Sequence, residues 1–98
     1  MSEREQQGTE GSAGSRADAR SVEGLLTYLA RGLVDHPEEV IVERFDEEDE
    51  TILLELSVAE DDYGKVIGRG GRTAQALRTV LRASADAQGH RVLLDIVD

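Results

Sequence analysis

The segment Gly64-Lys65-Val66-Ile67-Gly68-Arg69-Gly70-Gly71-Arg72-Thr73 carries the clearest structural signal in the chain. It places a Gly-x-x-Gly turn, residues 68–71, directly after an apolar pair and directly before a stretch with helical periodicity. Because glycine has no Cβ, a phosphate chain can approach the backbone of such a turn closely. The N–H groups at the start of the following helix add partial positive charge. The segment therefore predicts a surface on which backbone groups bind an anion.

Charge is distributed unevenly along the chain. The 98 residues have a formal net charge of −10, which argues against general binding to polyanions. Residues 1–63 hold 5 basic and 18 acidic residues, whereas residues 64–91 hold 6 basic residues and 1 acidic residue. The strongly basic segment is thus the one with the glycine turn. This pattern predicts a local anion site on an otherwise acidic protein.

Composition divides the chain into two parts. Residues 1–20 lack large aliphatic and aromatic side chains, so burial cannot offset the entropy of ordering them, and we expect a disordered tail. Residues 21–98 are expected to form a single folded domain. There is no Cys, and no apolar run has the length of a signal peptide core or a membrane span. The expectation is a soluble cytoplasmic protein.

Apolar spacing predicts two main helices. The first is expected to end before Pro37, with His36 as a cap at its C-terminus. The second is expected over residues 72–87, and a very short helix capped by Asp61 or Asp62 should precede the glycine turn. In the second main helix, the residues expected to face the core are Ala74, Leu77, Val80, Leu81 and Ser84.

Three segments have the character of strands, over residues 40–45, 51–58 and 91–97. The last has apolar residues on both faces, which predicts a position inside the sheet rather than at its edge. The connection before it is long enough for a crossover. The predicted fold class is therefore α+β, with the order α-β-β-α-α-β and a three-stranded sheet whose helices pack on one face.

Other phosphate-binding loops fit the glycine turn less well. A Walker A loop needs Lys and then Ser or Thr after its last glycine, but Arg72 and Thr73 follow Gly71. A dinucleotide-binding fingerprint needs a third glycine where Thr73 stands. A plain tight turn between two helices remains the structural alternative, because glycine turns are common.

The turn and its surroundings resemble those of KH domains, whose Gly-x-x-Gly loop holds the backbone of a nucleic-acid strand. Residues 33–40, 63–72 and 76–80 are similar to the small stand-alone bacterial KH proteins of the KhpA type, and the similarity covers roughly residues 21–98. The element order resembles the type II, prokaryotic form of the fold. The resemblance implies a single-stranded RNA-binding protein that acts as an RNA chaperone or post-transcriptional regulator. It also implies a homodimer, or a heterodimer with a second KH-domain protein.

The resemblance further implies which residues contact RNA. N–H groups of Gly70, Gly71 and Arg72 would point at phosphate oxygens, and the basic side chains would neutralise phosphates, with Arg78 as a further candidate. Bases would turn onto the apolar pair before the turn and onto an edge strand. The residues expected at the RNA site are Lys65, Val66, Ile67, Gly68, Arg69, Gly70, Gly71, Arg72 and Gln75.

Three alternatives to RNA binding are a protein-interaction module, an enzyme and a metal-binding protein. The net charge favours, as the main alternative, a KH-like protein-interaction module with weak or no RNA binding. An enzyme is disfavoured because no acid–base–nucleophile set is evident, and His36 and His90 each stand alone. The acidic run over residues 46–50 lacks the glycine and the ligand spacing of a calcium loop. We therefore expect no metal, cofactor, small-molecule substrate or membrane partner.

Overall fold

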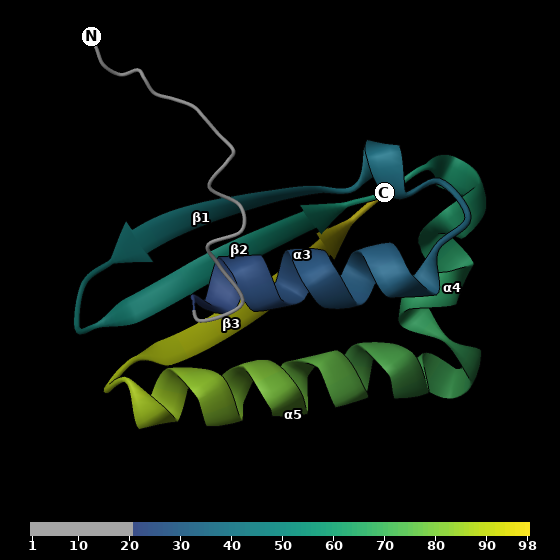
Figure 1. Cartoon of the computed structure of the whole chain (residues 1–98). Helices are drawn as coiled ribbons and strands as arrows, with labels where there is room; N and C mark the ends of the chain where they lie inside the picture. Colours follow the sequence, from purple (N-terminus) through teal and green to yellow (C-terminus); the bar gives the residue numbers. More distant parts are fainter. Residues whose placement is uncertain (1–20) are drawn as a thin grey trace, which may run out of the picture.

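The structure, a computed structural model, describes residues 21–98 (Figure 1). The disordered tail predicted over residues 1–20 lies outside the described residues. The predicted element order is confirmed within the described part. The helices and strands are α3 (Val22–Leu33), β1 (Ile41–Glu47), β2 (Thr51–Ser57), α4 (Tyr63–Ile67), α5 (Arg72–Ala87) and β3 (Arg91–Val97), with 3-10 turns at Pro37–Glu39, Glu60–Asp62 and Arg69–Gly71.

The three strands form one sheet in the order β1-β2-β3. β1 and β2 are antiparallel, whereas β2 and β3 are parallel and are connected through α4 and α5. The expectation that β3 lies inside the sheet is wrong, since β3 is an edge strand. The two apolar faces of β3 differ in their surroundings. Val92 and Leu94 are buried in the core, whereas Leu93 lies on the opposite face and is 51% exposed.

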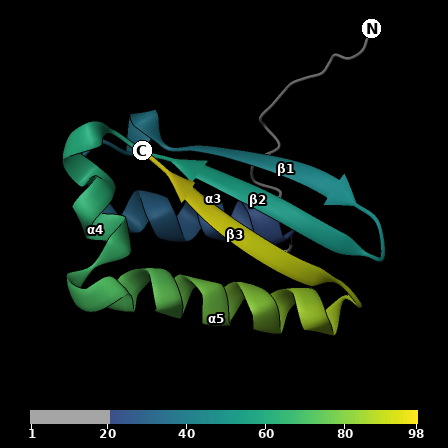
Figure 2. The same cartoon turned by 180° about the vertical axis from the view of Figure 1, so that it is seen from behind.

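Helices α3 and α5 cover one face of the sheet, and the core lies between them and β2 (Figures 1 and 2). Alternate residues of β2 point into this core, as their spacing predicts. Each fully buried leucine contributes about 2 kcal/mol relative to an exposed one. The buried residues of the core cluster are Val22, Leu26, Ala30, Ile52, Leu54, Leu56, Val66, Leu77, Leu81, Ala85, Val92 and Leu94.

Two details of the helices differ from expectation. In α5, Val80 was expected in the core but is 44% exposed, and Ala85 is buried while Ser84 is only partly buried. The buried face of α5 consists of Ala74, Leu77, Leu81 and Ala85. Helix α3 ends at Leu33 rather than near Pro37, because Val34 already adopts an extended conformation.

The acidic run forms the tip of the β1–β2 hairpin. Strand β1 continues to Glu47, and Asp49 and Glu50 adopt positive φ angles of 60° and 56° in the turn. Within residues 21–98, no group of three or more potential metal-ligating side chains comes together. Among the described helices, none combines the length and apolar character needed to span a membrane.

Candidate nucleic-acid interface

The glycine turn lies at one end of the domain, where α4 passes into α5 beside the end at which β2 and β3 finish (Figures 1 and 2). Gly68 stops α4 with φ 78° and ψ 168°, a conformation that residues with a side chain avoid. The N–H of Gly68 donates to the Gly64 carbonyl at 2.8 Å, and the N–H of Gly71 donates to the Gly68 carbonyl at 3.0 Å. The turn is therefore a single 3-10 turn held by its own backbone.

These backbone bonds correct one part of the expected phosphate contacts. The N–H of Gly71 is engaged with Gly68, and the N–H of Arg72 donates to the Arg69 carbonyl. Both donors were expected to point at phosphate oxygens, but both are used inside the turn. The backbone donors that remain as candidates are the N–H groups of Arg69 and Gly70.

The side chains of Arg69, Arg72 and Gln75 are exposed around this turn. Neither arginine forms an ion pair with another residue of the described part. Gly70 faces open space, because a Cβ added there would meet no heavy atom within 4 Å. The turn thus combines two available guanidinium groups with an uncovered stretch of main chain.

The two apolar residues before the turn have different positions. Val66 has 0% exposure and belongs to the core cluster, so its side chain anchors the segment before the turn in the core. It cannot form a surface on which a base lies, which corrects its expected role in the groove. Ile67 is partly exposed and keeps that role as a prediction.

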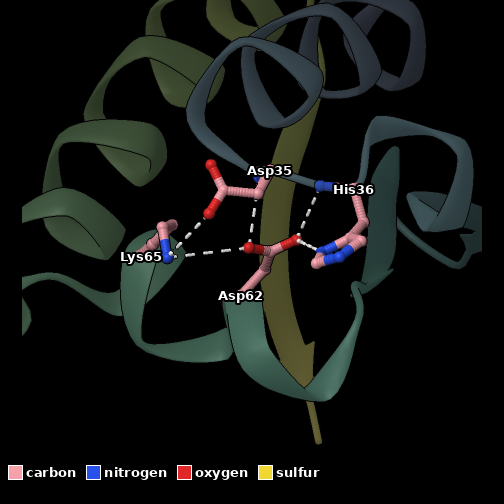
Figure 3. A network of polar contacts seen from close by, with 4 residues as sticks. All are labelled: Asp35, His36, Asp62 and Lys65. Carbon is pink, nitrogen blue, oxygen red and sulfur yellow. Dashed lines mark hydrogen bonds and ion pairs between the residues drawn. The ribbon is translucent and has the colours of Figure 1, made fainter.

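A buried carboxylate, Asp62, lies at the start of α4, the end of that helix away from the glycine turn (Figure 3). The side chain of Asp62 has 0% exposure and accepts hydrogen bonds from the backbone N–H groups of Asp35 at 3.1 Å and His36 at 2.9 Å. The Nδ1 atom of the His36 ring lies 3.0 Å from the same carboxylate. Asp61 or Asp62 was expected to cap the short helix α4, and His36 to cap α3. Asp62 occupies the N-cap position of α4, but its side chain makes no capping hydrogen bond there. Instead, Asp62 and His36 join the loop after α3 to the start of α4.

Lys65 belongs to this same network, which changes its expected role. Its Nζ atom lies 3.4 Å from the Asp35 carboxylate and 3.8 Å from that of Asp62 (Figure 3). Two carboxylates therefore offset the charge of Lys65, whereas Arg69 and Arg72 have no such partners in the described part. An RNA phosphate would have to compete with these carboxylates for Lys65.

The contacts between Asp62 and His36 shift both pKa values. The hydrogen bond to Asp62 raises the pKa of His36 above its ordinary 6.5. Burial of Asp62 acts to raise its own pKa, but the hydrogen bonds from Asp35 and His36 together lower it below its ordinary 3.8. The network therefore favours a charged carboxylate beside a protonated imidazole.

These two shifts predict how stability depends on pH. The contribution of His36 is complete below its ordinary pKa of 6.5 and is lost as pH rises through its raised pKa in the folded protein. The contribution of Asp62 is complete above 3.8 and is lost as pH falls through its lowered pKa. Thermal melts should show Tm falling as pH rises above 6.5 and through the raised pKa of His36. The fall should be absent in His36→Gln and present in His90→Gln; equal curves for both variants would contradict the assignment.

A depression of about 150 Å³ lies between α5 and the edge strand β3. Its walls are apolar on the sheet side and carry two guanidinium groups on the helix side. Arg78 donates from Nη2 to the Leu94 carbonyl at 3.3 Å, while Arg82 is exposed. Sequence reasoning missed Arg82, although its spacing of one helical turn from Arg78 was a usable signal. The lining residues are Arg78, Leu81, Arg82, Val92, Leu93 and Leu94.

Gly68→Ala tests whether the turn needs this glycine. An added Cβ would come within 2.7 Å of Thr73 Cβ and 2.8 Å of the Thr73 backbone nitrogen, and would also clash with Thr73 Oγ1. With the positive φ, this should lower Tm by about 5 °C in a thermal melt. The control is Gly64→Ala, because Gly64 is helical and its added Cβ would meet nothing within 4 Å. A Gly68→Ala variant as stable as this control would show that the turn tolerates a side chain.

A three-stranded sheet with one parallel and one antiparallel pair, covered on one face by helices and carrying a Gly-x-x-Gly turn between two of them, defines a type II KH domain. A family model described as KhpA/KhpB, KH domain, matches residues 23–96. The chain belongs to the KhpA/KhpB KH-domain family.

Curated relatives agree with this assignment. A protein of Halalkalibacterium halodurans named RNA-binding protein KhpA is 51% identical over 74 residues, which cover 76% of this chain and 96% of the relative. The protein of the same name from Treponema pallidum is 53% identical over 76 residues, covering 78% of this chain and 94% of the relative. The one from Bacillus subtilis is 43% identical over 77 residues, covering 79% and 94%. The similarity therefore extends over nearly the whole length of these relatives.

Proposed function

We propose that this chain binds single-stranded RNA through the turn formed by residues 68–71. The observation that carries the proposal is the exposed turn itself, where Arg69 and Arg72 lack ion-pair partners in the described part of a protein with net charge −10. In an acidic protein, two cations without ion-pair partners beside an exposed backbone turn indicate a binding site for an anion. The curated relatives, named RNA-binding proteins, support this function.

In the proposed complex, one phosphate lies against the turn. The N–H groups of Arg69 and Gly70 and the side chains of Arg69 and Arg72 supply the donors, and a hydrogen bond from a guanidinium to a phosphate is a strong one. Gln75, one turn into α5, can donate to the next sugar or phosphate. Gly68 and Gly71 keep Cβ atoms out of the path of the strand.

The bases turn toward Ile67 and along the depression between α5 and β3. This depression offers apolar walls, and its two arginines can stack on or bond to a base edge. Such a shallow surface at an edge strand accepts a base only when the base is unpaired, which favours single strands over duplexes. In this mechanism Val66 holds the turn in place, and Lys65 contributes less charge than Arg69 or Arg72.

A salt titration tests the proposal. With Arg69 and Arg72 as the main phosphate contacts, the logarithm of affinity for a single strand should fall with a slope of about −1.4 against the logarithm of salt concentration. This corresponds to a loss of about sevenfold between about 50 and 200 mM salt, measured by fluorescence anisotropy with labelled single-stranded RNA. A duplex of the same sequence should bind more weakly. Affinity independent of salt, or equal affinity for the duplex, would count against the turn as the binding site.

We further propose that the protein acts as an RNA chaperone or post-transcriptional regulator in the cytoplasm, as a dimer or together with a second KH-domain protein. One domain with so few phosphate contacts binds weakly, and two joined domains raise the effective affinity without any new contact. Sedimentation of the protein over a range of concentrations, with and without RNA, measures this association. The alternative, a KH-like protein-interaction module, finds support in the net charge of −10.

A further inference from the structure

The sheet has a second face, which α3 and α5 leave uncovered (Figure 2). The register of the strands brings the side chains of this outer face into rows of three, one residue from each strand. One acidic row lies between two mainly apolar rows, and a polar row follows at the hairpin end of the sheet. In order, the rows are Ile41, Ser57 and Val97; Glu43, Glu55 and Asp95; Phe45, Leu53 and Leu93; and Glu47, Thr51 and Arg91.

The apolar rows are substantially exposed. Phe45 is 43%, Leu93 51% and Ile41 57% exposed. These are three of the six large apolar residues that the described part leaves exposed, and they share one face of one sheet. Single exposed apolar residues need no explanation, but a group of them on one uncovered face indicates an interaction surface.

The acidic row is unfavourable for the isolated domain. Glu43 lies directly opposite Glu55, and Glu55 lies directly opposite Asp95, so three like charges stand side by side. Like charges directly opposite each other destabilise a sheet. Within residues 21–98, none of the three carboxylates forms an ion pair. A cation that arrived on this face would relieve their repulsion.

We propose that the outer face binds a basic amphipathic helix of a protein partner, with Lys or Arg over the acidic row and apolar side chains over the rows beside it. Charge complementarity selects this occupant. RNA phosphates would meet Glu43, Glu55 and Asp95, and a second copy of the chain would bring two acidic rows and two charges of −10 together. Three strands about 4.8 Å apart give a face about as wide as the 10 Å diameter of a helix.

The outer face and the glycine turn can be occupied at the same time. The turn lies beyond the end of the sheet between α4 and α5, whereas the outer face lies on the side away from α3 and α5 (Figure 2). The turn itself is separate from the outer face, whereas Leu93 borders both the outer face and the depression beside β3. The domain would link an RNA strand on its basic turn to a basic protein on its acidic sheet.

A titration followed by NMR tests the inference on the full chain. The probe is a synthetic helix of about 18 residues with leucine along one side and lysine along the borders of that side, and its control carries glutamate in place of lysine. Adding the lysine peptide should shift amide signals of β1, β2 and β3, with little change in α5 and the glycine turn. The glutamate peptide should leave the spectrum unchanged.

Matched variants separate the outer face from the general acidity of the protein. The triple variant Glu43→Gln, Glu55→Gln, Asp95→Asn should bind the lysine peptide about tenfold more weakly. The control Glu38→Gln, Glu60→Gln, Asp86→Asn loses the same charge at exposed positions elsewhere and should bind like the parent. Phe45→Ser should likewise weaken binding, whereas Tyr28→Ser, at a 72% exposed aromatic residue on α3, should not.

Several results would overturn the inference. They are absence of peptide binding, equal losses in the two triple variants, or signal shifts concentrated on α5. A parent protein that self-associates through this face, with a monomer restored by Phe45→Ser, would show that a second copy covers it instead. RNA affinity of the outer-face variants should equal that of the parent, so failure of this inference is distinguishable from failure of the proposed RNA site.

Discussion

Replacing Arg69 and Gly70 together by aspartate should abolish detectable binding to single-stranded RNA while the domain stays folded. The change puts two carboxylates where the phosphate is proposed to lie and removes one of the two available guanidinium groups, so affinity should fall by more than about tenfold. The fold should tolerate it, because both residues are exposed and a Cβ at Gly70 meets open space. Aspartate is also among the residues that tolerate positive φ, here 62°. Anisotropy measures the affinity, and circular dichroism with a thermal melt checks the fold.

The chain offers a closely matched control for this experiment. Arg31 and Gly32 form the same dipeptide at exposed positions near the end of α3, and an added Cβ at Gly32 meets nothing within 4 Å. Arg31→Asp with Gly32→Asp changes the net charge by the same amount and should retain RNA binding. If both double variants lost affinity equally, the effect would reflect net charge alone and the assignment of the turn would be wrong.

Asp62→Ala should cause the largest loss of stability among single substitutions near the site. The substitution removes the acceptor for the N–H groups of Asp35 and His36 and for the His36 ring, all grouped around a side chain with 0% exposure. Donors that lose their acceptor in a partly buried site are costly, and we expect Tm to fall by about 15 °C. Thermal melts and urea denaturation measure the loss.

Two further variants define the cause of that loss. Asp61→Ala changes the exposed neighbouring acid and should alter Tm by no more than about 2 °C. Asp62→Asn keeps one oxygen acceptor and should lie between Asp62→Ala and the parent. An Asp62→Ala variant as stable as Asp61→Ala would show that solvent replaces the carboxylate, and the network would then have no structural role.

Much of the fold follows from local patterns in the sequence. Alternation in residues 51–58 predicts the face of β2 that enters the core, and the glycines at 68, 70 and 71 predict a turn, in which all three adopt positive φ. These signals are local, because side-chain direction and backbone freedom depend on neighbours in sequence. The order of elements also follows from these patterns, and the resemblance to KH proteins adds the assignment to the type II form of the fold.

What the sequence did not predict depends on contacts between distant residues. Asp62 meets the backbone of Asp35 and His36 across more than a third of the domain, and no spacing rule connects such positions. Because Leu93 is apolar, the sequence predicts that β3 lies inside the sheet. In the described part, β3 pairs only with β2 and is therefore an edge strand. The outer face is visible only when the register of all three strands is known.

The backbone bonds inside the glycine turn have a consequence for the speed and selectivity of recognition. Because Gly68 and Gly71 already donate to carbonyls of their own segment, the turn has its shape before any strand arrives. A preorganised surface loses little conformational entropy on association, so encounter should be fast and should depend weakly on base identity. In the proposed complex, selectivity would then come from dissociation rates, which contacts between the bases and the depression beside β3 would set.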